Sequence, residues 1–350
     1  MTANKLSSIL PGVIIGGGVF NTQMNDDPLK LPIANIIAKA FAAGARAIDT
    51  SPYYGPSETL IGKALAEAIV QDSITRADYI LMTKVGRIAL DRFDYSADWV
   101  KSSVERSLNR LGTSYLDVVF CHDVEFVTEE EVLEALSTLF DLQAQGVIRF
   151  VGISGYPPSA ISDLLPAISN RFGRGPDVIQ NYSHFNLQNT VLEKHIDHWK
   201  SFGVDCVINS SPLSMGLLSG RRAAAFHPAP PGLREATLQV AKKCEHLGYE
   251  LPEIALKYVV GYWNLLRDRN GGGAAIFGVS SEKELDDVVN AYRELMVGGD
   301  AITELGNRRQ VNTDKLDLYE PIFAALKAEF GEWLDYSWDS PPSDFVRKRH

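Results

Sequence analysis

The feature that most constrains the fold of this chain is an alternation of short β-branched runs with longer amphipathic segments. Each run is apolar, ends in polar residues, and is followed by a segment in which apolar residues recur with helical spacing. The predicted strands are residues 12–16, 45–50, 79–84, 116–122, 148–154, 178–182, 204–210 and 274–277. Eight strand–helix units favour a closed parallel (β/α)8 barrel of the TIM type, an α/β fold, over an open doubly wound sheet.

The apolar spacing between the strands predicts helices over residues 58–70, 97–110, 129–145 and 191–202. Gly146 and Gly203 follow the last two, where glycine often ends a helix. Residues 215–232, after the seventh strand, are predicted to be irregular because they are rich in proline. We therefore expect a single domain over residues 1–350, with the barrel at about 10–295.

An additional C-terminal segment, about residues 300–350, follows the eighth strand–helix unit. It carries Trp333, Tyr336 and Trp338 in a setting rich in proline and aspartate. Such a segment either forms a lid over the barrel or is a tail packed against it. The packed tail is the simpler alternative.

Charge and hydropathy exclude several classes of function. The chain has 34 basic and 44 acidic residues, a formal net charge of -10, which would repel nucleic-acid backbones and anionic lipid surfaces. No apolar stretch reaches the roughly 18 residues that a membrane span needs. Cys121, Cys206 and Cys244 have no metal-type or redox-type spacing, which is typical of ordinary thiols in a reducing compartment. We expect a cytoplasmic protein with no nucleic-acid, membrane or metal partner, and nothing in the sequence predicts an oligomeric state.

Polar side chains gather where the predicted strands end. In a barrel of this type the active site is built at the carboxyl ends of the strands. Asp49, Lys84 and His122 end the second, third and fourth strands, and Tyr54 lies five residues beyond Asp49 in the stretch "AIDTSPYYGP". Together they form a candidate catalytic set of acid, phenol, ammonium and imidazole.

These four residue types suit acid–base chemistry at a hydroxyl or carbonyl carbon. A tyrosine with an ordinary pKa near 10 needs that pKa lowered, and a buried ammonium such as Lys84 can do so. Two unit charges about 4 Å apart at an effective dielectric of about 20 interact by about 4 kcal/mol, roughly three pKa units. Asp49 would keep Lys84 charged, and His122 would orient the reacting oxygen. Each residue also has a plain alternative, as a rim lysine, a turn aspartate or a core histidine.

At these residues the sequence resembles the aldo-keto reductase family, which carries an Asp, Tyr, Lys and His tetrad on a (β/α)8 barrel and uses a nicotinamide cofactor. "AIDTSPYYGPSETLIGKAL" resembles its Asp-Thr-Ala/Ser-x-x-Tyr-Gly signature, "LMTKVG" its lysine segment and "VVFCHDVEF" its histidine segment. The resemblance covers about residues 10–293 and implies catalytic roles for Asp49, Tyr54, Lys84 and His122. Tyr54 takes the acid–base role because it directly precedes Gly55, and Tyr53 is left to pack or line the rim.

The resemblance also implies cofactor contacts, although the sequence departs from the family at several of them. "VGISGY" has Gly155 in place of the family's Asn, and Ser210 stands where an aromatic ring often stacks on the nicotinamide. In "AIFGVSSEKEL", Gly278 and Val279 replace Lys-Ser, and Glu284 replaces the Arg that clasps the 2′-phosphate of NADP. The implied contacts are Ser154, Gln180, Ser210, Pro212, Leu213, Gly278, Ser280 and Glu284.

Glu284 predicts NAD rather than NADP, because a carboxylate repels a phosphate but can accept hydrogen bonds from free ribose hydroxyls. As an alternative that is compatible with this role, Ser281 and Glu284 form a helix capping box.

Within the family, "CHDVEF", "SSPLSMGLLSG" and "FHPAPPGLREA" resemble a subgroup of sugar dehydrogenases that act on L-galactose and D-arabinose. The resemblance implies that the small-molecule substrate is an aldose, which is oxidised at C1 to the lactone with NAD, and we favour D-arabinose. The alternatives are a broad-specificity NADPH-dependent aldehyde or carbonyl reductase, a dinucleotide-binding regulatory subunit, and a non-redox barrel enzyme.

Overall fold

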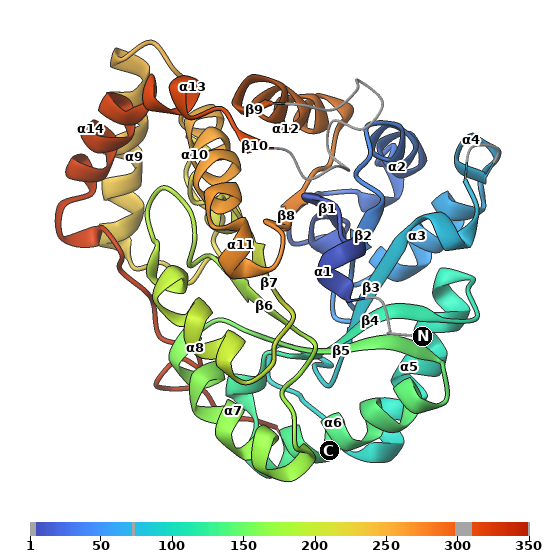
Figure 1. Ribbon diagram of the computed structural model, residues 1–350. Helices are drawn as coiled ribbons and strands as arrows, with labels where there is room; N and C mark the ends of the chain where they lie inside the picture. Colours follow the sequence, from blue (N-terminus) through green and yellow to red (C-terminus); the bar gives the residue numbers. More distant parts are fainter. Residues whose placement is uncertain (1–4, 72–73, 298–309, 349–350) are drawn as a thin grey trace.

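A closed barrel of eight parallel strands forms the centre of the molecule (Figure 1). The structure is a computed structural model that describes residues 5–71, 74–297 and 310–348. The strands are β1 (Val13–Gly16), β2 (Ala47–Asp49), β3 (Ile80–Val85), β4 (Leu116–His122), β5 (Ile148–Gly155), β6 (Val178–Tyr182), β7 (Cys206–Ser210) and β8 (Ala275–Gly278). Each strand pairs with the next, and β8 pairs with β1. The predicted fold is confirmed; the predicted bounds of β4 and β6 are those observed, and the other strands differ by one or two residues.

Helices surround the barrel on the outside (Figure 1). They are α2 (Ile33–Ala42), α3 (Ser57–Ala66), α4 (Ala68–Gln71), α5 (Ala97–Leu111), α6 (Glu129–Ala144), α7 (Pro158–Phe172), α8 (Ile196–Ser201), α9 (Pro231–His246), α10 (Leu251–Leu265), α11 (Arg267–Asn270) and α12 (Glu282–Leu295). A short helix, α1 (Leu6–Ile9), precedes β1, and Ser7 holds it to Asp205 ahead of β7 through two hydrogen bonds of 2.7 Å.

Three predicted segments differ from the structure. The helix expected over residues 58–70 is interrupted at Glu67, whose backbone is extended, so that it forms α3 and α4. The helix expected over residues 191–202 begins as a 3-10 turn, Val191–His195, because Leu192 N–H bonds to the distant His184 carbonyl. The interval 215–232 is not irregular throughout: a 3-10 turn covers Ser214–Gly216, and α9 begins at Pro231, where the missing N–H of proline costs no helical hydrogen bond.

Alternation along the strands divides the apolar residues between two cores. Outward-facing residues pack against the helices, and inward-facing ones fill the barrel. The interior cluster consists of Leu6, Leu10, Ile14, Ala47, Ile80, Met82, Val118, Phe120, Val178, Cys206, Ile208, Ala274 and Ile276. The lower part of the barrel is therefore packed with side chains, so that chemistry is confined to its ends.

The same alternation explains why polar residues meet at one end. Two positions after an interior residue, each strand again points inward, one layer nearer its carboxyl end. The residues of this layer include Asp49, Lys84, His122, Ser154, Gln180, Ser210 and Gly278. The register aligns three of them, since His122 pairs with Ser154 and Ser154 with Gln180. Asp49 and Lys84 are stepped by two residues relative to their neighbours, since they pair with Met82 and Phe120. We call this end of the barrel, formed by the carboxyl ends of the strands, the mouth.

At the opposite end, Asp117 ties three strands together. Its buried carboxylate accepts hydrogen bonds from Leu81 N (2.9 Å), Arg76 Nη2 (2.7 Å) and Arg149 Nη1 (2.7 Å). Because β3, β4 and β5 share this acceptor, it fixes their register from below the mouth. Buried carboxylates of this kind are stable only when their oxygens are fully hydrogen-bonded.

The C-terminal segment contacts the outer helices, and its residues 300–309 and 349–350 lie outside the described residues. Its described elements are β9 (Met296–Val297), β10 (Gln310–Val311), α13 (Thr313–Asp317), α14 (Glu320–Phe330) and a 3-10 turn, Gly331–Trp333. Helix α14 packs against α9 (Figure 1). Residues 334–348, which we call the C-terminal strap, then run from α14 to α6, where Arg347 forms an ion pair with Glu131 at 2.6 Å. Within the described parts of the chain, no helix is long and apolar enough to cross a membrane.

The close approach of α3 and α5 requires glycine at position 62. A Cβ atom there would overlap the backbone carbonyl oxygen of Arg110 in α5. We expect Gly62→Ala to lower the free energy of unfolding by about 1–3 kcal/mol, because the two helices must move apart. Gly261→Ala in α10 is the matched control: its Cβ would meet only the flexible end of Leu316, and it should cost less. Urea unfolding of both variants tests this, and equal losses would contradict it.

Candidate active site

The centre of the mouth is a buried ion pair between Lys84 and Asp49. Lys84 Nζ lies 2.8 Å from Asp49 Oδ1 and 2.6 Å from Oδ2, and it also donates to the carbonyl oxygen of Thr50 at 3.0 Å. The two side chains are 1% and 3% exposed. The ammonium thus gives its three protons to three oxygens, which is the condition under which a buried charge can persist.

Tyr54 lies over this pair on the loop that follows β2. Tyr54 N–H bonds to the Ser51 carbonyl at 3.0 Å, and Gly55 takes a positive φ of 57° that closes the turn. Lys84 Nζ lies 5.1 Å from the centre of the Tyr54 ring, and the ring meets His122 edge-on at 5.6 Å. The structure therefore brings all four predicted catalytic residues together at the mouth.

The predicted lowering of the Tyr54 pKa by Lys84 is wrong for this arrangement. The pKa of Tyr54 lies well above its usual value of 10, chiefly because of burial, and the negative charges of Asp49 and Asp123 raise it further. Lys84 cannot offset these effects, because Asp49 neutralises its charge at direct contact. Tyr54 is consequently a neutral phenol at physiological pH.

His122 is also neutral. Burial lowers the pKa of its imidazole to about 3, although the charge of Asp123 opposes the shift. Its Nδ1 is 3.1 Å from Ser51 Oγ, and that oxygen already accepts Tyr53 N–H at 3.1 Å. The hydroxyl proton of Ser51 is thus free to point at Nδ1, an arrangement that places the ring proton on Nε2. Nε2 then serves as a hydrogen-bond donor at the mouth.

Sequence reasoning missed a second ion pair beside His122. Arg87, two residues after β3, donates a hydrogen bond to Asp123 Oδ2, and that oxygen is 3.7 Å from His122 Nε2. The Arg87 guanidinium stacks on the ring of Tyr53, 4.1 Å from its centre. The signal was present in the sequence, because Asp123 directly follows the strand end at His122.

The opposite side of the mouth offers hydrogen bonds to a flat polar group. Ser154, Gln180 and Ser210 are all buried on neighbouring strands. Gln180 Nε2 donates to Ser210 Oγ at 2.9 Å, whereas its Oε1 is buried without a partner among the described residues. An unpartnered buried acceptor is costly unless a ligand donor meets it. The amide of a nicotinamide has such a donor, so these residues fit the cofactor.

The remaining predicted cofactor contacts lie on two loops at the mouth. Pro212 is buried and Leu213 half-buried in the turn after β7, where Ser211 and Ser214 adopt left-handed backbone conformations. Gly278 ends β8 and is exposed.

Glu284 is exposed in the first turn of α12 and is held in place by hydrogen bonds. Its Oε2 accepts from Ser280 N at 2.6 Å and from Ser280 Oγ at 3.0 Å. Ser281 Oγ in turn accepts from Glu284 N at 3.2 Å, so that only half of the capping box forms, and the carboxylate reaches one residue further back. Glu284 is therefore a fixed negative charge beside β8.

The C-terminal strap lines one side of the mouth. Trp338 stacks on Tyr156, which follows β5, with ring centres 4.5 Å apart, and the backbone N–H of Trp338 donates to the Tyr156 hydroxyl at 3.1 Å. Ser340 Oγ donates to Glu125 Oε1 at 3.0 Å, beyond the end of β4. Burial and the charge of Asp123 raise the pKa of Glu125 to about 8. These contacts hold the strap along the ends of β4 and β5.

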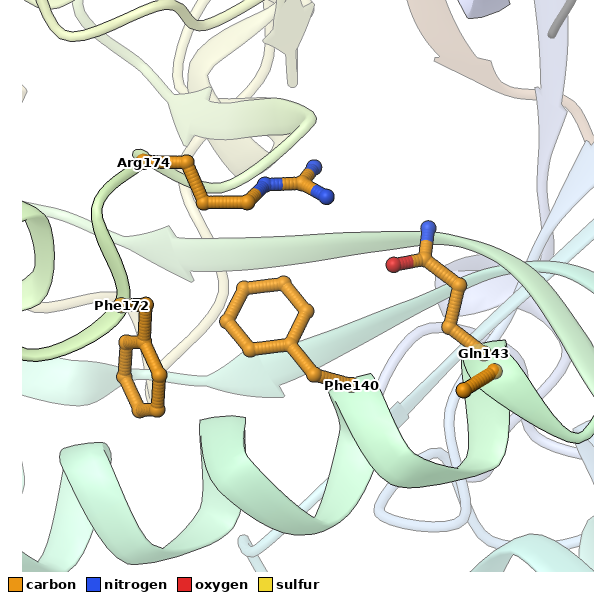
Figure 2. Close-up of a pocket in the computed structure, with 5 residues that line it drawn as sticks. Phe140, Gln143, Phe172 and Arg174 are labelled. Carbon is orange, nitrogen blue, oxygen red and sulfur yellow. The ribbon is translucent and has the colours of Figure 1, made fainter.

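A hollow on the outer surface has no part in this site (Figure 2). Phe140 and Gln143 of α6 face Phe172 and Arg174 at the end of α7, and the Arg174 guanidinium lies 5.1 Å from the Phe140 ring centre. None of these residues belongs to the mouth. The hollow results from the packing of two neighbouring helices.

Comparison with known proteins gives one consistent result. The sequence profile of the Aldo/keto reductase family matches residues 13–298. D-arabinose 1-dehydrogenase of Saccharomyces cerevisiae is 39% identical over 301 residues, which cover 85% of this chain and 87% of that protein. L-galactose dehydrogenase of Arabidopsis thaliana is 33% identical over 298 residues, covering 84% and 86%. A solved chain from Pseudomonas aeruginosa has a TM-score of 0.53 at 22% identity, covers 84% of this chain and 90% of its own length, and supports the fold alone.

The lowered pKa of His122 predicts a loss of stability in acid. Below pH 6.5 the unfolded chain takes up a proton at His122 that the folded protein refuses down to about pH 3, so stability falls across this window. Between pH 6.5 and 4.5, the free energy of unfolding should fall by roughly 2–3 kcal/mol less in His122→Gln than in the wild type. Urea unfolding at several pH values measures this. The pKa of His184, lowered to about 4, affects both proteins alike, and parallel curves for the two would contradict the expectation.

Proposed function

The chain belongs to the aldo/keto reductase family, and from this premise we propose that it oxidises the C1 hydroxyl of an aldose to the lactone, with NAD as the hydride acceptor. The arrangement that carries the proposal is Tyr54 and His122 meeting edge-on over the buried Lys84–Asp49 pair. The names of the two curated relatives support D-arabinose or L-galactose as the substrate type. A cytoplasmic location is part of the proposal, supported by the three buried free cysteines.

Each residue of the set has a task in this reaction. The C1 hydroxyl lies between Tyr54 and His122, where His122 Nε2 donates a hydrogen bond to the C1 oxygen and the phenolate form of Tyr54 takes the proton of the C1 hydroxyl. Lys84 and Asp49 hold the floor of the site and place a cation below the phenol ring. When bound, a nicotinamide dinucleotide supplies the acceptor for the hydride from C1.

The neutral Tyr54 also supports a second candidate function in the opposite direction. A phenol whose pKa is raised is a competent proton donor to a carbonyl oxygen. Reduction of an aldehyde or ketone uses Tyr54 in the protonation state that predominates at physiological pH, whereas oxidation requires its phenolate. Oxidation by this site should therefore accelerate as the pH rises.

NAD is the proposed cofactor because of Glu284. Its carboxylate is fixed at the start of α12 by Ser280, near the end of β8. A negative charge at this position disfavours a 2′-phosphate and suits free ribose hydroxyls. Gln180 and Ser154 are proposed to hold the amide of the nicotinamide. In this proposal the unpartnered Gln180 Oε1 accepts a hydrogen bond from the amide.

The role of Tyr54 is tested by replacing it with phenylalanine, which removes only the hydroxyl group. We expect Tyr54→Phe to lower kcat for D-arabinose oxidation by about 10²- to 10⁴-fold, the usual contribution of a general acid–base group. NAD affinity, followed by quenching of protein fluorescence, should change little.

Tyr53→Phe is the matched control, since it removes a hydroxyl group from the adjacent ring. It should retain most of the activity, and wild-type oxidation should increase towards alkaline pH. Full turnover by Tyr54→Phe would remove the proposed proton acceptor.

The cofactor preference is tested with Glu284→Arg. We expect the ratio of kcat/KM for NAD over NADP to fall by about tenfold or more, which corresponds to ~1.4 kcal/mol. The reason is that a repulsive charge opposite the 2′-phosphate becomes attractive.

Glu282→Arg is the control, because Glu282 is an exposed carboxylate in the same helical turn and undergoes the same change of charge. It should leave the ratio nearly unchanged. A lysine at position 278 is a poorer test, because a Cβ there would lie 2.6 Å from Val19 Cγ1. If both variants shift the ratio equally, general electrostatics rather than contact by Glu284 sets the preference.

A further inference from the structure

The Arg87–Asp123 pair lies at the mouth but takes no part in the chemistry assigned above. Both side chains come from loops that directly follow β3 and β4, and they are 12% and 3% exposed. Asp123 adopts a left-handed backbone conformation, with φ 59° and ψ 62°, which residues other than glycine seldom use. Strained backbone of this kind often marks a functional position.

The hydrogen bonding of this pair is incomplete. Arg87 uses Nη1 for Asp123, but its Nε is buried without a partner among the described residues. On the other side of the pair, no described residue donates a hydrogen bond to Asp123 Oδ1. The pair thus presents spare donors beside a spare acceptor, within reach of the His122 imidazole.

A second buried pair shows that this is not a general property of the barrel. At the opposite end, the guanidinium of Arg76 has an acceptor at each nitrogen, including Asp117, Tyr79 O and Thr113 Oγ1. Asp117 in turn accepts hydrogen bonds at both oxygens. A purely structural pair in this protein is therefore fully satisfied, and the pair at the mouth is not.

Two aromatic rings border the same space. Tyr53 lies against the Arg87 guanidinium and meets His122 edge-on at 5.9 Å. Tyr182 ends β6, two positions after Gln180, and is half-buried, 5.2 Å from the Tyr156 ring. Burial raises the pKa of Tyr182, and the charges of Asp123 and Glu125 raise it further, which places this side chain within electrostatic range of the ion pair. Rings of this kind can cover the apolar C–H face of a sugar.

We propose that Arg87 and Asp123 bind two hydroxyl groups on adjacent carbons of the aldose, next to the C1 atom held at His122, and thereby determine which sugars are accepted. A guanidinium and a carboxylate side by side match adjacent hydroxyl groups, because each hydroxyl both donates and accepts. This inference rests on the proposed function, which it extends from the reacting carbon to the carbons beside it.

The experiment compares D-arabinose with its 2-deoxy and 3-deoxy forms in the presence of NAD. The wild type should lose about 10- to 100-fold in kcat/KM when one of the two hydroxyl groups is missing, as expected for a hydrogen bond to a charged group. In Asp123→Asn, and in the double variant Arg87→Gln with Asp123→Asn, the ratio of parent to deoxy sugar should fall to a few-fold. Asparagine is the suitable replacement because it tolerates the left-handed backbone of Asp123.

Arg76→Gln is the matched control, since it breaks a buried pair far from the mouth. It should lower the free energy of unfolding and leave the ratio of kcat/KM for D-arabinose over each deoxy sugar unchanged. Arg87→Lys keeps the charge but loses the planar fork, so it should lower the ratio even if the other variants fail to fold.

Three outcomes overturn the proposal, and they are distinguishable. If the wild type oxidises D-arabinose without discriminating against either deoxy sugar, the subsite is refuted with no variant needed. If the folded variants keep the wild-type ratio, the pair has only a structural role. If the wild type oxidises no aldose, the proposed function itself fails and the subsite fails with it.

Discussion

The contact between the Lys84 ammonium and the Asp49 carboxylate is the constraint on which the rest of the mouth depends. Both charged groups are buried, and they remain charged because the ammonium donates hydrogen bonds to three oxygens. Asp49 offsets the positive charge of Lys84, and its own negative charge raises the pKa of Tyr54. The pair therefore does not make the phenol acidic: Asp123 raises the pKa of Tyr54 further, and Arg87 opposes the shift.

Position along a strand connects this contact to the fold. Inward residues recur at every second position of a strand, so polar residues at the last inward positions form the polar layer at the mouth. Below that layer Met82, Phe120 and Ile208 fill the interior, and below them Asp117 holds β3 to β5 in register. A shift of one residue in any strand would turn its polar side chain out towards the helices.

Much of this could be predicted from the sequence, because period-two alternation and the polar residues that end it are local features. Lys84 and His122 could be placed at the mouth in this way, whereas Tyr54 needed the resemblance of its loop to a known motif. The pKa of Tyr54 could not be predicted, because it depends on burial and on charged groups that three loops bring together. Arg87 was missed because an arginine two residues past a strand resembles a solvated rim residue. Only its three-dimensional contact with Asp123 and Tyr53 shows otherwise.

The C-terminal strap has a consequence for how the protein is made. Ser340 is 215 residues from Glu125, the carboxylate it binds beyond the end of β4, and Trp338 covers Tyr156 from a similar separation. During synthesis β4 and β5 therefore leave the ribosome well before the strap that packs beside their ends, and the later strands are made in between. A nascent barrel would expose Tyr156 and Glu125 throughout that interval, and this side of the mouth is complete only once the strap has been synthesised.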